Sequence, residues 1–349
     1  MKIAKETIVS PQGEIALYTL TNAHGSSVRL SSLGAGIVSV VVPDCEGHRD
    51  DVVLGYAHVS DYFHDGPCAG KVPGRYANRI GKGQFELDGV KYQLRINNGP
   101  HALHGGPEGF ANKLWDSEVT ETGVRFTLLS ADGDENYPGN VVAGVDYTWN
   151  DEDQLTLVFM AKSDKKTIIN LTNHTYWNLS GENSGTVLDH KLWLACSHYV
   201  PTDDTLLPTG HFETVKGTPM DFTAFKRLGR DLRQDFPALN YGKGYDNCWM
   251  VDGWQQNRLQ KVAELVDEKS GRRLEVISTQ PAVQVYTGNW LAGSPGNKGA
   301  GRSYNDYEGV AIECQGVPDA PNHPQFPSQV LTPDREYKQI IVFKLSVIR

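Results

Sequence analysis

The stretch 154–159 reads Gln-Leu-Thr-Leu-Val-Phe, with a large apolar side chain at every second position. This period of two is typical of a β-strand that buries one face and leaves the other in contact with water. The same alternation recurs at 124–128, 273–277 and 339–345. Because these runs are spread widely along the chain, they predict a protein built mainly of β-strands.

Clusters of turn-forming residues separate the predicted strands, for example 97–100 (Asn-Asn-Gly-Pro) and 294–297 (Ser-Pro-Gly-Asn). Helical candidates are short, the clearest being 229–236, and no rhythm of strand, helix and strand is visible. We therefore expect an all-β fold, a large antiparallel β-sandwich with few short helices. No linker or low-complexity tract divides the chain, so we expect a single domain over residues 1–349.

Charge and composition narrow the range of partners and locations. The net charge is −9 and the sequence pI is about 5.7, which argues against nucleic acid and anionic membrane surfaces as partners. The chain shows no signal-peptide pattern and no stretch near the roughly 18 apolar residues of a spanning helix. The five cysteines are scattered without a CxxC pair, which favours a reducing compartment. We therefore expect a cytoplasmic protein.

Two short patterns could suggest a metal ion, and a third could suggest a nucleotide. His101 and His104 have a spacing that metal ligands use, but no cysteine or carboxylate stands close enough in sequence to complete a zinc set. The acidic turn 132–135 lacks the length and pattern of a calcium-binding EF-hand loop. The glycines of 81–83 lack the third glycine and the following helix of a dinucleotide site. We predict neither a metal site nor a nucleotide site from these patterns.

Four segments hold more polar and titratable side chains than a strand or turn with only a structural role would be expected to carry. They are GRYANRI at 74–80, LHGGPEGF at 103–110, NLTNHTYWNL at 170–179 and ECQGVPDAPN at 313–322. Taken one at a time, each segment is better explained by a structural role. Together they outline a site.

The third and fourth segments indicate what this site would recognise. In an extended chain, alternate side chains share one face, which here holds Asn170, Thr172, His174, Tyr176 and Asn178. Such a face is a poor apolar core, whereas amides and aromatic rings suit the hydroxyls and the C–H faces of a sugar. Glu313 follows the apolar run 309–312, and a carboxylate at the end of a buried strand must be paired or functional.

These segments resemble the signature regions of the aldose 1-epimerase (galactose mutarotase) family. Six blocks occur in the family's order: GRYANRI, LHGGPEGF, NLTNHTYWNL, GYDNCW at 244–249, TQPAVQVYTGNWL at 279–291 and ECQGVPDAPN. The turn DGDENYPG at 132–139 is also typical of the family. The resemblance covers nearly the whole chain, and it implies the large β-sandwich that the strand pattern predicts independently.

The resemblance also implies roles for individual residues. By its motifs, His174 protonates the ring oxygen of the sugar, and Glu313 removes the proton of the C1 hydroxyl. The resemblance implies that the sugar site is lined by Asn78, Arg79, His104, Tyr176, Asp246 and Gln284.

Chemistry supports such an acid–base pair without reference to the family. Opening a hemiacetal requires the C1 hydroxyl to lose a proton while the ring oxygen gains one, and each positioned group contributes about 10²–10⁴-fold. The reaction needs no redox cofactor and no covalent intermediate. We therefore expect an isomerase that interconverts the anomers of free hexoses such as galactose and glucose, without a cofactor. Glu313 is expected to be ionised and His174 protonated in the productive free protein.

Three other functions can be weighed against this one. A non-catalytic sugar-binding module would have no need of both Glu313 and His174. A hexose-phosphate mutarotase would need additional lysines or arginines near the site, which the sequence does not place. The set of motifs disfavours a glycosidase or lyase on the same fold. The preferred aldose and the oligomeric state stay open at the level of sequence.

Overall fold

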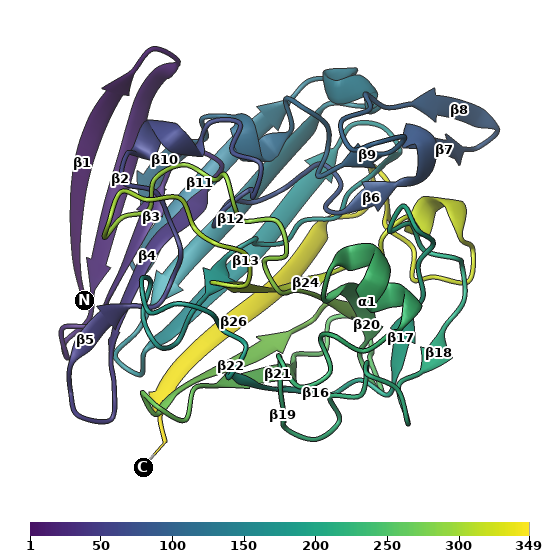
Figure 1. Ribbon diagram of the computed structural model, residues 1–349. Helices are drawn as coiled ribbons and strands as arrows, with labels where there is room; N and C mark the ends of the chain where they lie inside the picture. Colours follow the sequence, from purple (N-terminus) through teal and green to yellow (C-terminus); the bar gives the residue numbers. More distant parts are fainter. Residues whose placement is uncertain (349) are drawn as a thin grey trace.

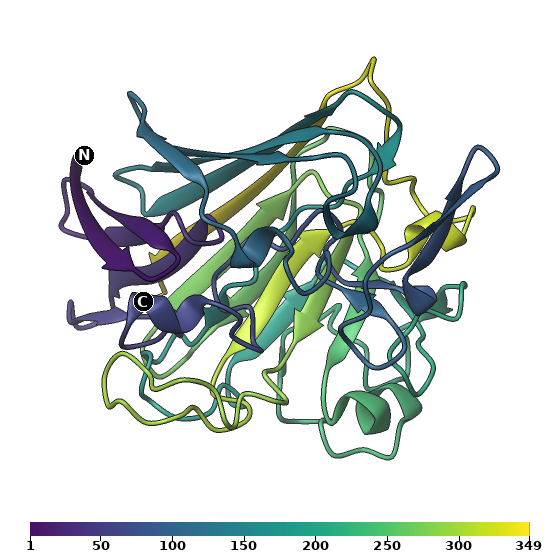
Figure 2. The ribbon, with the colours of Figure 1, turned by 90° about the horizontal axis from the view of Figure 1, so that it is seen from above.

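The computed structural model describes residues 1–348, and antiparallel β-sheet dominates it (Figure 1). The strands form three large sheets and three two-stranded ribbons. In Figure 2, the purple N-terminal strands lie at one end of the molecule and the green helix α1 (Pro237–Gly242) at the other, with the sheets between them. The expected all-β, antiparallel class is confirmed.

The largest sheet has nine strands in the order β10-β11-β12-β13-β26-β22-β21-β16-β19. The predicted runs at 124–128, 154–159, 273–277 and 339–345 form β11, β13, β22 and β26 of this sheet. In Figure 1, the yellow strand β26 runs between the teal β13 and the green β22, so the last strand of the chain joins two parts of the sheet. The strand bounds are β10 Asp116–Val119, β11 Gly123–Ser130, β12 Val141–Trp149, β13 Gln154–Ser163, β16 Lys191–Leu194, β19 Lys226–Arg227, β21 Gln260–Val266, β22 Arg272–Ser278 and β26 Tyr337–Val347.

Two further sheets pack with the largest one. The five-stranded sheet, in the order β1 to β5, consists of β1 Lys2–Ser10, β2 Gly13–Thr21, β3 Ser27–Ser31, β4 Gly36–Pro43 and β5 Arg49–Asp51. The six-stranded sheet has the order β15-β24-β23-β20-β17-β18. Its strands are β15 Tyr176–Trp177, β17 His198–Val200, β18 Glu213–Thr214, β20 Asp246–Met250, β23 Ala282–Tyr286 and β24 Val310–Gln315.

The remaining elements are short. The ribbons pair β6 Arg79–Ile80 with β9 Ala102–Leu103, β7 Gln84–Leu87 with β8 Val90–Gln93, and β14 Thr167–Ile168 with β25 Val330–Leu331. Single 3-10 turns occur at η1 Val59–Tyr62, η2 Gly81–Gly83, η3 Phe110–Asn112, η4 Asp134–Asn136 and η5 Ala320–Asn322.

The helix predicted at 229–236 is wrong, because this segment forms turns and the helix α1 begins directly after it. Asp231 forms an ion pair with Lys226 at 2.9 Å and accepts a hydrogen bond from Gln234, so its side chain stabilises a turn. Pro237 then supplies the fixed φ and the missing N–H that suit the first position of a helix.

One large apolar cluster forms the centre of the molecule, and its members run from Tyr18 on β2 to Leu345 on β26. The alternating strand pattern directs apolar side chains into this cluster. In β13, Leu155, Leu157 and Phe159 are fully buried, while the residues between them are partly exposed. Burying each such side chain contributes about 1.5–3 kcal/mol. In residues 1–348, no helix has the length and apolar character needed to cross a membrane.

Candidate active site

The six-stranded sheet has one face in the apolar core and the other face toward a pocket. On β24, Val310, Ile312 and Cys314 belong to the core cluster. Glu313 therefore points to the opposite face, where it lines the pocket. The expectation that Glu313 ends its strand is wrong, because pairing with β23 continues through Gln315. The carboxylate thus stands in the interior of a regular strand, where the backbone holds it in place.

Neighbouring strands bring two further predicted residues to this face. Gln284 on β23 is paired directly with Glu313, and Asp246 begins the adjacent β20. The Gln284 Nε2 atom donates a hydrogen bond of 2.7 Å to Asp246 Oδ1. This contact leaves the second Asp246 oxygen, Oδ2, facing Arg79 NH2 at 3.6 Å. Arg79 and Asp246 therefore form an ion pair at the pocket wall.

His174 reaches Glu313 from an irregular segment. Its backbone N–H donates to the Lys71 carbonyl, and its own carbonyl accepts from the Gly70 N–H, both at 2.9 Å. These two bonds anchor the segment on both sides of the side chain. His174 Nε2 then lies 3.5 Å from Glu313 Oε1. The ring of Tyr176 is 5.0 Å from the imidazole, centroid to centroid, and its hydroxyl donates to the Pro67 carbonyl.

The expected hydroxyl-reading face of segment 170–178 is only partly present, because three of its five residues lie outside the pocket and bind backbone carbonyls instead. Thr172 donates to the Cys314 carbonyl at 2.7 Å. Asn170 and Asn178 donate to other buried carbonyl groups. The segment is not one regular strand, and buried carbonyls need partners, so these polar groups serve structure. Only His174 and Tyr176 of this face line the pocket.

One end of the β6–β9 ribbon presents Asn78, Arg79 and His104. Asn78 and His104 both have left-handed backbone angles, with φ of 67° and 53°. The Asn78 N–H donates to His104 Nδ1 at 3.1 Å, so the neutral imidazole carries its proton on Nε2. The Arg79 Nε donates to Asn98 Oδ1 at 3.2 Å. The His104 and His174 rings meet edge to face at 5.2 Å, which joins this end of the ribbon to the facing His174 and Glu313 side chains.

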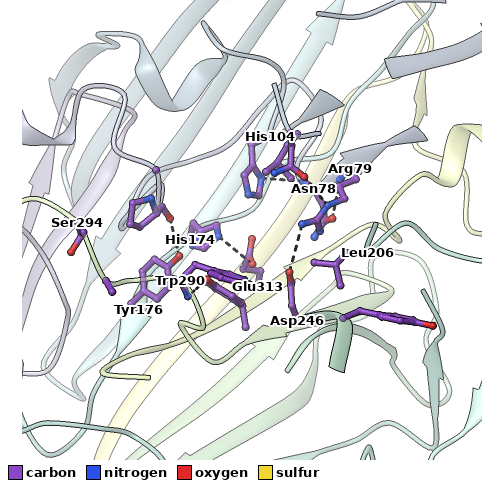
Figure 3. A pocket seen from close by; sticks show the side chains of 18 of the residues that line it. Asn78, Arg79, His104, His174, Tyr176, Leu206, Asp246, Trp290, Ser294 and Glu313 are labelled. Carbon is purple, nitrogen blue, oxygen red and sulfur yellow. Dashed lines mark hydrogen bonds and ion pairs between the residues drawn. The ribbon is translucent and has the colours of Figure 1, made fainter. Parts of the chain in front are cut away.

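The pocket between these elements has a volume of about 580 Å³ (Figure 3). The predicted site residues that line it are Asn78, Arg79, His104, His174, Tyr176, Asp246 and Glu313. Gln284 does not line this pocket, but it lines a small neighbouring cavity and donates a hydrogen bond to Asp246 of the pocket wall. The lining also contains Leu206, Tyr241, Tyr286 and Trp290, which the sequence did not single out. Tyr286 could have been found, because it follows Gln284 at the period of two that keeps strand residues on one face.

Burial controls the protonation of the facing pair. It raises the pKa of Glu313 well above its ordinary value, with the charge of Asp246 adding to the effect and Arg79 opposing it. Burial also lowers the pKa of His174 to about 4, although a local backbone interaction opposes the shift. The pKa of His104 is lowered well below its ordinary value, first by burial and then by nearby cationic groups. In the protein without a sugar, a neutral carboxyl facing a neutral imidazole is therefore favoured over the charged pair expected from the sequence.

The dismissed metal patterns have other partners in the structure. His101 Nδ1 accepts from the Lys82 N–H, and its Nε2 lies 2.8 Å from the Thr205 hydroxyl. Each carboxylate of the turn 132–135 binds a lysine or arginine side chain. In the part of the chain that the structure describes, no three His, Cys, Asp or Glu side chains are grouped as metal ligands would be.

Known proteins with the same fold and similar sequence are readily found. The aldose 1-epimerase family model matches residues 16–344. Human galactose mutarotase is 42% identical over 320 residues, which cover 92% of this chain and 91% of that protein. Aldose 1-epimerase of Escherichia coli K12 is 35% identical over 343 residues, with 96% and 97% covered.

Solved structures agree with these relatives. An aldose epimerase homologue from C. elegans superposes with a TM-score of 0.87 at 30% identity, covering 99% of this chain and all of that one. Galactose 1-epimerase from Lactobacillus acidophilus gives a TM-score of 0.86 at 27% identity, covering 100% and 99%. With a family model spanning nearly the whole chain and relatives this similar along their full length, the chain belongs to the aldose 1-epimerase family of isomerases.

Proposed function

We propose that this protein interconverts the α and β anomers of free aldohexoses such as galactose and glucose, with Glu313 and His174 as the acid–base pair. The observation that carries the proposal is the buried contact of these two side chains, 3.5 Å apart, on the wall of a sugar-sized pocket. Ring opening moves one proton off the C1 hydroxyl and another onto the ring oxygen. A carboxylate and an imidazolium on the same wall provide both transfers.

The charge states follow from the pair taken as a unit. The neutral pair and the charged pair hold the same number of protons and the same net charge, so moving one proton from Glu313 to His174 converts one into the other. Glu313 then takes the C1 proton, and His174 gives its proton to the ring oxygen. After rotation about C1–C2, the ring closes on the other face of the carbonyl with both roles reversed. Arg79 and Asp246 would hold hydroxyl groups meanwhile.

Charge in the pocket supports a free sugar over a sugar phosphate. Among the described residues that line it, Asp204, Asp246 and Glu313 can carry negative charge, whereas Arg79 is the only arginine or lysine. Arg79 already faces Asp246. A phosphate group would meet net negative charge here, while neutral hydroxyls can pair with either sign. The presence of both Glu313 and His174 likewise disfavours a non-catalytic sugar-binding module.

Two further features belong to this proposal. The main apolar cluster draws on residues from β2 to β26, which supports one domain over residues 1–349. All five cysteines are free, with only Cys45 exposed, which supports a reducing, cytoplasmic environment.

Polarimetry tests the proposal directly. Catalytic amounts of protein are added to freshly dissolved α-galactose, α-glucose and α-glucose 6-phosphate, before and after treatment with a chelator. We expect faster mutarotation of the free sugars, little acceleration of the phosphate, and retained activity after chelation. Activity lost on chelation and restored by one particular metal would contradict the metal-independent mechanism. Selective action on the phosphate would contradict the substrate class.

A further inference from the structure

Leu206 has an unusual backbone conformation for an aliphatic residue. Its φ is 63°, in the left-handed region that glycine and asparagine occupy readily and that a side chain with a branched body occupies only at a cost in free energy. Such a conformation persists only where the surrounding structure enforces it. The contacts around Leu206 show how it is enforced.

A network of side-chain hydrogen bonds holds the turn that contains Leu206. The Asp203 Oδ1 atom accepts from the Thr205 N–H at 2.8 Å, the Thr205 hydroxyl at 2.6 Å and the Leu207 N–H at 3.1 Å. The Thr205 hydroxyl also lies 2.8 Å from His101 Nε2, which ties the turn to another loop. Because the hydroxyl donates to Asp203, it accepts from His101. The turn is therefore fixed from two sides.

The side chain of Leu206 lies at the pocket wall that holds Arg79 and Asp246 (Figure 3). A Cβ built on Gly242 would stand 3.9 Å from Leu206 Cδ2 and 3.4 Å from Asp246 Cβ, so the leucine methyl and the aspartate flank the same small space. The strained turn thus places an aliphatic group beside polar groups that face the pocket.

We propose that Leu206 is a sugar-contacting residue, which packs against a C–H face of the aldose while Arg79 and Asp246 hold its hydroxyls. The inference rests on the proposed function of this pocket. Contact with an apolar C–H face removes apolar surface of both partners from water. It also excludes water from the neighbouring polar contacts, which strengthens them. A sugar that turned a hydroxyl toward Leu206 would leave that hydroxyl without a partner.

The test uses two substitutions with opposite chemistry. Leu206→Asn suits the left-handed backbone and has a similar size, but it replaces the apolar contact with an amide. We expect its KM and Kd for galactose to rise about five- to tenfold, while Tm stays at or above that of the wild type. Leu206→Met keeps an apolar side chain of similar volume, and we expect its KM within about twofold of the wild type. Mutarotation gives KM, calorimetric titration gives Kd, and thermal unfolding gives Tm.

Leu207→Asn is the matched control. Leu207 is the next residue of the same turn, is also half-buried, and lies outside the left-handed region and the pocket lining. Its side chain approaches Gly81, so its loss should lower Tm and leave KM unchanged. Unchanged KM and Kd in Leu206→Asn, or an equal rise in Leu207→Asn, would overturn the inference. Absence of mutarotation by the wild type would instead overturn the proposed function, and the Kd comparison would still report on Leu206.

Discussion

The carboxylate oxygen Oε1 of Glu313 lies 3.5 Å from Nε2 of His174, in a contact whose side chains are only 2% and 6% exposed. Each charged form is disfavoured by this burial, yet transfer of a proton between the two groups leaves the net charge of the pair unchanged. Under the proposed function, the two groups would act as an acid and a base that can exchange roles. This exchange is what opening and closing a sugar ring requires.

Substitution of the pair should lower turnover in a non-additive way. Glu313→Gln keeps shape and removes the base, and His174→Asn removes the acid while keeping a polar group. Each should lower kcat by about 10²-fold or more, or roughly 2.7 kcal/mol of transition-state stabilisation. The double variant should lose less than the product of the two losses, since both groups serve one step. Folded single variants with near-normal kcat would show that the chemistry lies elsewhere.

The pH dependence of kcat/KM should be bell-shaped, with its acidic limb set by the imidazole. The active pair holds one proton, and it gains a second as pH falls through the His174 pKa of about 4. It loses its proton at the alkaline limb, which the raised pKa of Glu313 sets. This assignment reverses the one expected from ordinary pKa values. Imidazole ¹⁵N shifts provide the check, and a His174 that is imidazolium at pH 7 in the sugar-free protein would contradict it.

As pH rises, the Glu313→Gln variant should become more stable relative to the wild type. The folded protein keeps the Glu313 proton above the unfolded pKa of about 4.3, so between that value and the raised folded pKa the folded state binds more protons. Wild-type stability therefore falls with rising pH by up to about 1.4 kcal/mol per unit from this group, and glutamine removes the loss. The Tm difference between variant and wild type should be larger at pH 8 than at pH 5. The exposed Glu86→Gln serves as control and should show no such trend.

Loss of the Arg79–Asp246 contact should weaken sugar binding more than it weakens the fold. Both groups face the pocket, and their 3.6 Å separation is long for an ion pair, which leaves each free to bind a hydroxyl. Arg79→Ala and Asp246→Ala should each raise KM about tenfold or more, with kcat changed less. Steady-state mutarotation and thermal unfolding measure the two effects. Unchanged kinetics together with a lowered Tm would assign the pair to structure alone.

Gln284 should act through Asp246, because its amide donates to one carboxylate oxygen at 2.7 Å. Gln284→Glu replaces this donor with a like charge, and we expect KM to rise about tenfold or more. Gln284→Leu removes the bond without adding charge and should cost less. Titration with galactose gives the two affinities. If both variants bound galactose as tightly as the wild type does, Gln284 would not orient Asp246.

The sequence by itself determined several of the long strands and part of the pocket lining. Alternation at 154–159 and 339–345 predicts β13 and β26, because a half-buried strand must present apolar groups at every second residue. The resemblance to the aldose 1-epimerases likewise named most of the polar residues that line the pocket, because the motifs that carry it can be read from the sequence. The helix predicted at 229–236 was wrong. Asp231 stabilises a turn there and Pro237 starts the helix later, and residue propensity does not capture these two effects.

Only the tertiary structure decided how these residues are used. Asn170 and Thr172 have the chemistry of sugar ligands, yet they bind carbonyl groups that folding brings against them. Burial raises the pKa of Glu313 and lowers that of His174, which favours the proton on Glu313, opposite to expectation, because desolvation depends on what covers the two side chains and not on their neighbours in sequence. In the sequence, nothing distinguishes Leu206 from other loop residues. In the structure, the hydrogen bonds of Asp203 hold it in a left-handed backbone conformation at the pocket. Burial and long-range contacts, which are properties of the folded chain as a whole, set each of these outcomes.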